Sequence, residues 1–457
     1  ETHYAYVAIE QCHGGRLSAL AEPDAAMYWR SLGANNDQFL LYAFPASNSD
    51  DGDAVAELRS RAVRIADLHL GIARTPNDLD YPRWVPVPIV DDQFCVHTAA
   101  TWDDCLRAVA GFMGQGSLVQ GSEGEGRRAG PLWRVHVFAA ITGAPEAVGP
   151  ATVVVLQISH ALGDGRRVSD LARRLLSDEK SEHRDRDASM LPSATGVGIV
   201  ADIAAAMVGV ATVLPRLAAA TVVGLLAWRS EQPPAGLPVI EATPLNLPAD
   251  GAVELRTITV SRDGLRRYGP SVTVSVMAVL AHVLAGVGGA TSEGQVVAEV
   301  TLARPPTVRR RNNFHTVAVD LHAEAEVADR AGLIGDQIER AQRRDGTTAR
   351  RLERKAAGLV PAVLDSLAVR LGRRAPLPTH VAGATVVSSV NRGPADLMLG
   401  GRRVLFTAGF PALSPVHGLT HGVHGIGDRI TVSIAATGHA AAVVDDYARA
   451  VAAALRR

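Results

Sequence analysis

One histidine in this sequence stands where acid–base chemistry is commonly placed, directly after an apolar run and four residues before an Asp-Gly pair. The block SHALGDG covers residues 159–165 and contains His160, Asp164 and Gly165. An imidazole has an ordinary pKa near neutrality, so His160 could take a proton from a hydroxyl group at physiological pH. The pattern alone fits an ordinary histidine beside an Asp-Gly turn equally well.

The flanking residues predict how this histidine is held. Residues 152–158 form a β-branched apolar run that is typical of a buried strand. After Asp164-Gly165, the apolar residues Val168, Leu171 and Leu175 recur at helical spacing. We therefore expect His160 on a strand-to-helix connection, where reactive groups are often displayed.

The whole-chain composition excludes some classes of function. The chain has 457 residues, of which 47% are hydrophobic, enough for the cores of two to three domains. Its 46 basic and 47 acidic residues give a net charge of -1, which argues against a nucleic-acid-binding protein. Arginine clusters at 309–311 and 343–351 could hold the phosphates of an acyl carrier or form solvated helix faces.

The cysteines and a histidine-rich segment give little support for a metal site. Cys12, Cys95 and Cys105 contain no CxxC pair, so neither a disulfide framework nor a zinc site is predicted, and a reducing cytoplasm fits. Glycines interrupt the segment 414–425, which carries three histidines. We expect this segment to be a loop rather than a metal site.

Helices and strands alternate along both halves, which indicates an α/β protein. The expected strands are 38–44, 132–141, 152–158, 254–260, 296–302, 314–321, 384–390, 403–410 and 429–435. The expected helices are 53–68, 102–113, 274–287, 323–343 and a closing amphipathic helix capped by Asp445.

A long apolar stretch, 197–228, separates the halves. Its length would span a bilayer, but it could equally be a buried crossover helix or an interfacial, lipid-lining segment. The Pro-rich residues 231–238 follow as a linker. We predict an N-terminal lobe at 1–190, a crossover and linker at 191–250, and a C-terminal lobe at 251–457. From Glu1 onward there is no basic-plus-apolar leader, so we expect that any targeting segment was removed or never existed.

Four segments together resemble the bacterial wax ester synthase/diacylglycerol acyltransferase family, within the superfamily of condensation domains and chloramphenicol acetyltransferases. Residues 130–134 (GPLWR) look like the PLW segment of the family, and 159–165 resemble its HHxxxDG signature. Residues 311–313 look like its GN segment, and 387–394 are similar to its SNVPGP segment. The order and spacing agree over essentially the full length.

This resemblance implies a two-lobed architecture of mixed β-sheets flanked by helices. An active-site tunnel would run between the lobes, open to acyl-CoA at one end and to an alcohol at the other. His160 would be the general base, Asp164 a structural support of its loop, and Gly165 a source of freedom in the turn. No cofactor is implied beyond acyl-CoA as co-substrate.

The resemblance also suggests residues around the histidine. Ser388, Ser389 and Asn391 would supply oxyanion donors from the opposite lobe, although they could be plain turn residues. Ser159 would either hydrogen-bond the loop or point into a core. Candidate tunnel-lining residues complete the prediction: Trp133, Asn312, His421 and His424.

The chain departs from the family pattern at three places. Ser159 replaces the first histidine, the helix 274–287 lacks an opening Asn-Asp, and Asn391-Arg392 stands where one proline is expected.

From the resemblance we expect esterification of diacylglycerol or a long-chain alcohol with fatty acyl-CoA. The alternatives are a glycolipid or other specialised acceptor, or an impaired lipid-binding or complex-forming homologue. The expected location is the cytoplasm, peripheral on the inner membrane face or on lipid bodies.

Overall fold

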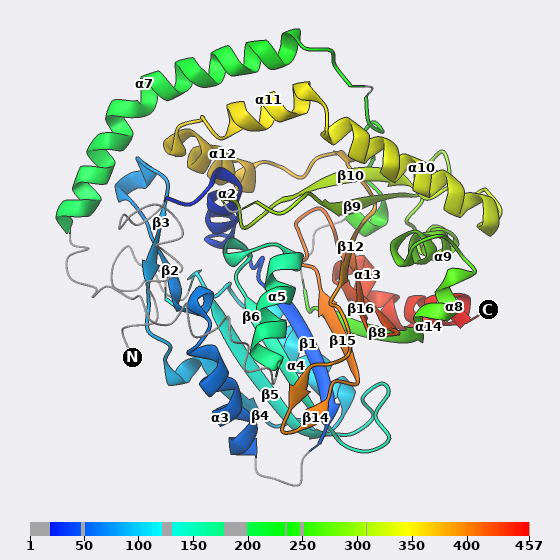
Figure 1. The fold of residues 1–457 in the computed structure, drawn as a ribbon. Helices are drawn as coiled ribbons and strands as arrows, with labels where there is room; N and C mark the ends of the chain where they lie inside the picture. The colour runs from blue at the N-terminus through cyan, green and yellow to red at the C-terminus, as the bar shows by residue number, and fades with distance from the viewer. Residues whose placement is uncertain are drawn as a thin grey trace.

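Two mixed β-sheets organise the chain in the computed structural model (Figure 1). The structure describes residues 19–46, 51–120, 130–177, 199–233, 235–246, 251–307 and 309–456. The first sheet has the strand order β15-β1-β6-β5-β4 and the second β10-β9-β12-β16-β17-β8. Cys12, the first of the expected lobe boundaries (190/191) and residue 250 at the second lie outside the described residues.

The first sheet carries the strand that leads to His160. Its strands are β1 (Gln38–Pro45), β4 (Phe94–His97), β5 (Trp133–Ile141), β6 (Ala151–Ile158) and β15 (Phe406–Phe410). Strand β6 pairs antiparallel with both β1 and β5, and all eight of its residues are buried. A central strand buried on both faces explains its continuous run of β-branched residues.

The second sheet lies beside the first and is built from the C-terminal half. Its strands are β8 (Glu254–Ser261), β9 (Val297–Ala303), β10 (Phe314–Asp320), β12 (Thr385–Asn391), β16 (Leu419–Ile426) and β17 (Arg429–Ala436). Strand β12 is central and pairs parallel with both β9 and β16. Short two-stranded sheets are formed by β2 (Leu70–Ala73) with β3 (Arg83–Pro86), β7 (Ile240–Glu241) with β11 (His380–Val381), and β13 (Met398–Leu399) with β14 (Arg402–Arg403).

Helices cover both sheets around three apolar clusters. Helices α2 and α5 contribute to a core on one face of the first sheet, α4 to a core on its other face, and α9, α10 and α14 to the core of the second sheet. The helices are α2 (Glu22–Ser31), α3 (Asp51–Ala62), α4 (Trp102–Gly114), α5 (Gly165–Leu176), α7 (Ile199–Arg229), α8 (Arg262–Arg266), α9 (Val272–Gly286), α10 (Val327–Asp345), α11 (Thr348–Ala357), α12 (Ala362–Arg374), α13 (Gly438–Ala442) and α14 (Val444–Arg456).

One strand of the C-terminal half belongs to the sheet of the first lobe, whereas the predicted division assigns all of 251–457 to the second lobe. Strand β15 comes from the C-terminal half but pairs antiparallel with β1 in the first sheet. It also packs against β16 and β17 of the second sheet. The two lobes are therefore joined by a shared strand in addition to the connecting segment.

The prediction of a loop at 414–425 is wrong for most of that segment, because 419–426 form the fully buried strand β16. Its glycines permit close packing between the sheets. A Cβ atom on Gly422 would lie 2.2 Å from the carbonyl oxygen of Gly409 on β15. In the closing helix α14, Asp445 lies in the first turn rather than at the cap.

The apolar stretch forms one 31-residue helix, α7, with Pro215 inside it. The helix arches along the outside of the molecule and packs against α11 (Figure 1). Within it, Ala206–Arg229 is long and apolar enough to cross a membrane, with a mean hydropathy of 1.8, and only 6% of that segment is buried. The expectation of a buried crossover helix is therefore wrong.

Candidate active site

His160 begins a single 3-10 turn, η5 (His160–Leu162), between β6 and α5. The backbone N–H of Ser159 donates to the carbonyl of Leu132, and Gln38 Nε2 donates to the carbonyl of Gly163 at 2.7 Å. The turn is therefore tied to neighbouring strands on both sides. As expected, the histidine lies on a strand-to-helix connection.

Asn312 sets the orientation and tautomer of the His160 ring. Its Nδ2 donates to the His160 carbonyl at 2.9 Å and to Asp24 Oδ1 at 3.0 Å, so its Oδ1 faces the ring. That oxygen lies 2.8 Å from His160 Nδ1. Because an amide oxygen only accepts, Nδ1 carries the proton and Nε2 keeps its lone pair. Asn312 thus holds the histidine instead of lining a tunnel.

Asp24, on α2, anchors the segment that carries Asn312, and the sequence analysis missed it. Its carboxylate accepts from the backbone N–H groups of Arg311 (3.1 Å) and Asn312 (2.7 Å), as well as from the Asn312 side chain. Burial raises the pKa of this carboxyl, and these hydrogen bonds offset part of the effect. Asp24 lies 136 positions before His160 in the chain, and no local motif marks it.

Asp164 stabilises the loop through backbone contacts. Oδ1 accepts from the N–H of Arg167, capping α5, and Oδ2 accepts from the N–H of Asn313 at 2.9 Å. The carboxylate thus joins the histidine loop to the segment that holds Asn312. The contacts are those of a supporting residue, because both carboxylate oxygens accept from backbone N–H groups.

Gly165 is needed for close approach rather than for turn freedom. It is the first residue of α5, and its backbone φ is not positive. A Cβ atom there would lie 2.9 Å from Cγ2 of Val390 on β12. The glycine therefore lets α5 approach the opposite lobe.

Two other expected site residues lie in the core beneath the loop. Ser159 is fully buried and its hydroxyl accepts from the N–H of Ala161, which is the loop hydrogen bond we expected as one alternative. Trp133 is buried and donates to the carbonyl of Leu68 at 2.8 Å. Neither side chain lines the cavity described below.

The three candidate oxyanion donors separate because side chains alternate along β12. Ser388 faces the cavity that also contains His160. Ser389 points to the other face and accepts from Thr273 Oγ1 at 2.8 Å. Asn391 is exposed, and its Oδ1 accepts from the N–H of Gly393. Among the three, Ser388 alone is placed to meet a substrate.

The same alternation divides the two histidines of β16. His421 is fully buried, and its ring nitrogens contact Thr385 Oγ1 (3.0 Å) and Tyr447 Oη (2.7 Å). Burial lowers its pKa to about 3. His424 lines the cavity, and its buried Nδ1 has no hydrogen-bond partner within the part of the chain that the structure describes.

Arg392 is a functional candidate that sequence reasoning passed over. It is only 2% exposed and lines the cavity near His424. Its Nη1 donates to Thr407 Oγ1 and to the carbonyl of Ala408. Burial lowers the pKa of Arg392, and burial together with the nearby guanidinium lowers that of His424. The signal in the sequence was the extra residue at 391–392, which places a cation between the sheets.

A cavity of about 460 Å³ connects these groups between the two lobes. His160 and Gly165 reach it from the first lobe, and Thr301, Phe314 and Ser388 from the second. Most of the lining is apolar, including Met27, Leu40, Val168, Val386 and Phe410. Burial lowers the pKa of His160, so the neutral imidazole persists at physiological pH. The site can therefore take a proton from a substrate that is itself mostly apolar.

A cluster of ion pairs joins the two lobes beside His160. Asp67 contacts Arg311 at 2.8 Å and Arg167 at 3.2 Å. Burial raises the pKa of Asp67, but the two guanidinium groups outweigh it and lower the pKa to about 2. Since Arg311 precedes Asn312, this pair holds the second-lobe segment against the histidine loop.

Comparison with known proteins establishes the fold. No protein-family model and no curated protein matches the chain. A wax ester synthase/diacylglycerol acyltransferase from Marinobacter aquaeolei VT8 is 17% identical, with a TM-score of 0.59 over 96% of this chain and 98% of that one.

Condensation domains give the same result. The first condensation domain of the CDA synthetase is 12% identical, with a TM-score of 0.54 over 97% of both chains. A starter condensation domain of rhizomide synthetase, in complex with C8-CoA and Leu-SNAC, is 13% identical with a TM-score of 0.50, over 96% of this chain and 95% of that one. The predicted two-lobed, condensation-domain-like architecture is therefore confirmed.

Proposed function

We propose that this protein is an O-acyltransferase that moves a fatty acyl group from acyl-CoA to a lipophilic alcohol, with His160 as the general base. The observation that carries the proposal is the Asn312-held imidazole, whose Nε2 lone pair is free, in a mostly apolar cavity between the lobes. Diacylglycerol or a long-chain alcohol as acceptor would give triacylglycerol or a wax ester. Acyl-CoA serves as co-substrate, and no cofactor is required.

The chemistry needs one base and one oxyanion donor. Nε2 of His160 accepts the hydroxyl proton as the alcohol oxygen attacks the thioester carbonyl carbon. The Ser388 hydroxyl donates to the resulting oxyanion. The C–S bond then breaks, and the imidazolium returns its proton to the departing CoA thiolate. Asn312 Oδ1 stabilises the transient imidazolium through Nδ1–H.

The comparisons support this chemistry by analogy. One protein with this fold is named a wax ester synthase/diacylglycerol acyltransferase, and a condensation domain with this fold is described in complex with C8-CoA. The motifs of the histidine block, residues 311–313 and residues 387–394 point to the first of these families.

The surface of α7 supports a lipid-associated location, and we propose that the protein binds the membrane or lipid bodies peripherally from the cytoplasm. Exposed apolar side chains run along the helix, including Leu214 (76% exposed) and Trp228 (72% exposed). One side of α7 docks on the protein, where Arg216 lies over the Tyr81 ring. A helix packed against the charged helix α11 is suited to an interfacial position rather than to spanning a bilayer.

A specialised acceptor is the second candidate, and the pair Arg392 and His424 favours it. Two buried nitrogen-bearing side chains in a mostly apolar cavity would suit an alcohol that carries further polar groups, such as a glycolipid. An impaired, lipid-binding homologue is less well supported. Ser159 lies in the core, and the contacts that orient His160 are made by Asn312 instead.

The test is an acceptor screen with the purified protein and palmitoyl-CoA. Free CoA and ester product should appear together, and only when diacylglycerol, hexadecanol or a glycolipid alcohol is present. Which acceptor gives product separates the two candidates. Stoichiometric co-purified lipid with no ester from any acceptor or acyl donor would refute the transferase and favour the lipid-binding homologue.

A further inference from the structure

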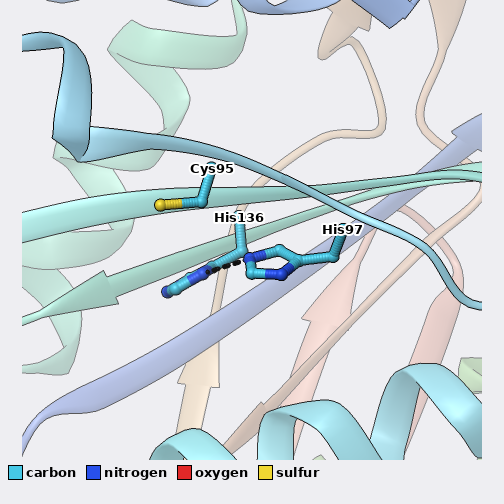
Figure 2. A group of neighbouring side chains, drawn as sticks. All are labelled: Cys95, His97 and His136. Atoms are coloured by element: carbon cyan, nitrogen blue, oxygen red, sulfur yellow. Dashed lines mark hydrogen bonds between the residues drawn. The ribbon is translucent and has the colours of Figure 1, made fainter.

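Three side chains that commonly ligate metals lie together at the edge of the first sheet, away from the His160 cavity. Figure 2 shows Cys95, His97 and His136 on adjacent strands. One ligand atom from each lies within 4.8 Å of the others. Cys95 and His97 are two residues apart on β4, and Cys95 is directly opposite His136 in the parallel pairing of β4 with β5. Because strand pairing brings these three residues together, no CxxC pair marks the cluster in the sequence.

The hydrogen bond that would orient His136 as a ligand is already formed. Gln157 Nε2 donates to Asp37 Oδ2 at 2.8 Å, so Gln157 Oε1 faces His136 Nε2 at 3.1 Å and accepts its proton. His136 Nδ1 therefore has a lone pair, which points to His97 Nε2 at 2.8 Å. Ligating histidines commonly donate their other ring N–H to such an acceptor, which fixes the tautomer.

Asp37, at the end of this relay, is a buried carboxyl group. Burial raises its pKa, while hydrogen bonds and the charge of Arg134 act to lower it. Asp37 is 1% exposed, and its Oδ1 has no hydrogen-bond partner among the described residues. Oδ2 accepts only N–H donors, from Leu118 and Gln157. Arg134 supplies the nearby positive charge. The hydrogen bonds from Asp37 through Gln157 fix the orientation and tautomer of the His136 ring, as they do for ligating histidines.

The surroundings hold the rings while leaving access to solvent. Phe112 stacks on His136 with centroids 4.2 Å apart, and Phe138 stacks on His97 at 5.0 Å. Cys95 and His97 are half-buried.

We propose that Cys95 Sγ, His97 Nε2 and His136 Nδ1 bind one zinc-class divalent ion, with water as the fourth ligand. One thiolate and two imidazoles form a ligand set that suits Zn²⁺. Zinc–ligand bonds of about 2.0–2.3 Å need ligand atoms roughly 3.3–3.8 Å apart. Rotation of the half-buried Cys95 and His97 side chains would bring the ligand atoms to this spacing, and it would move the two ring nitrogens, now 2.8 Å apart, away from each other. On binding, the thiol proton leaves to solvent. The proton that His97 Nε2 donates to His136 Nδ1 also leaves Nε2, and Nδ1 of His97 takes up a proton from solvent, so that the ring stays neutral.

The test uses the reduced full-length chain after removal of metals with EDTA, with Co²⁺ as the probe. One equivalent should bind and give the near-ultraviolet thiolate-to-cobalt charge-transfer band together with the visible bands of tetrahedral cobalt. One equivalent of Zn²⁺ should abolish them. If the parent chain binds no stoichiometric Co²⁺ or Zn²⁺, the proposal is overturned, and the His97–His136 contact is simply a buried hydrogen bond.

Three variants assign the ligands. Cys95→Ser should lose the charge-transfer band, while Cys105→Ser, at the buried cysteine of α4, should keep it. Gln157→Leu should keep the band but weaken Co²⁺ affinity by about 10- to 100-fold. Circular dichroism checks that each variant is folded. An unchanged spectrum in Cys95→Ser would exclude the proposed thiolate ligand and overturn the site.

Discussion

At the scale of single residues, the account depends on the tautomer that Asn312 imposes on His160. The sequence pointed to His160 as the base, and the structure places it at the cavity with Nε2 free. The sequence could not identify Asn312 or Asp24 as the supports of His160. Asn312 lies 152 positions after the histidine in the chain, and Asp24 lies 136 positions before it. Side-chain hydrogen bonds of this kind are decided by tertiary packing rather than by local pattern.

The pH dependence follows from the burial of His160. A base must be neutral, and burial lowers the pKa of this histidine below its ordinary 6.5. Activity should therefore persist as the pH falls through 6.5 and decline only at lower pH, when the imidazole becomes protonated. A profile of kcat/KM against pH measures this. An acid limb at or above pH 6.5 would contradict the described environment.

Ser388 and Ser389 form a matched pair for testing the oxyanion role. Ser388→Ala should lower kcat by roughly 10²- to 10³-fold, because a donor that acts in the transition state is lost. Ser389→Ala should change kcat little, since its hydroxyl contacts Thr273 on the other face of β12. Equal losses in both variants would indicate a structural effect of strand β12 instead.

At the scale of elements, strand and helix positions followed the hydrophobic pattern where burial was one-sided or continuous. Strands β1, β5 and β6 lie within one residue of the expected bounds at each end. Strand β16 was missed because its glycines resemble a loop, whereas they serve close contact with β15. The reason for these glycines becomes visible only when the two sheets are packed together.

Helix α7 gives a prediction at this scale. Replacing Leu214, Val222 and Trp228 by Glu should greatly reduce co-flotation of the protein with anionic phospholipid vesicles, because an interfacial helix binds through its exposed apolar side chains. Val148→Glu, at a fully exposed valine outside α7, is the control and should float like the parent. Undiminished flotation of the triple variant would rule out α7 as the lipid-binding element.

At the scale of the whole molecule, the site exists only where the lobes meet. The sequence predicted two lobes. It did not predict that β15 joins the first sheet or that Asp67 contacts Arg311, because these contacts join segments far apart in the chain. Asp67 of the first lobe pairs with Arg311 of the second, directly beside the residue that holds His160. Acid should therefore weaken the contact between the lobes.

The pH dependence of stability tests this contact. The pKa of Asp67 is lowered to about 2 from 3.8, so its contribution is fully present above about pH 4 and is lost as the pH falls towards 2. The shift corresponds to about 2 kcal/mol of unfolding free energy. Asp67→Asn should reduce stability at pH 7 by an amount of this order and flatten its decline below pH 4, as measured by urea unfolding.

Asp263→Asn is the control for that measurement, because its ion pair with Arg266 is 85% and 75% exposed at its two side chains. Exposed pairs contribute little to stability. If Asp67→Asn is as stable as Asp263→Asn at neutral pH, the Asp67–Arg311 pair does not hold the lobes together.

The most direct test of the central claim compares the parent chain with His160→Ala in the reaction of palmitoyl-CoA with the best acceptor alcohol. We predict that ester formation depends on the alcohol and that His160→Ala lowers kcat by at least about 10²-fold, the usual contribution of a general base. Asn391→Ala, at an exposed residue beyond the cavity, should retain parental activity. Ester formation by folded His160→Ala at the parental rate would contradict the account.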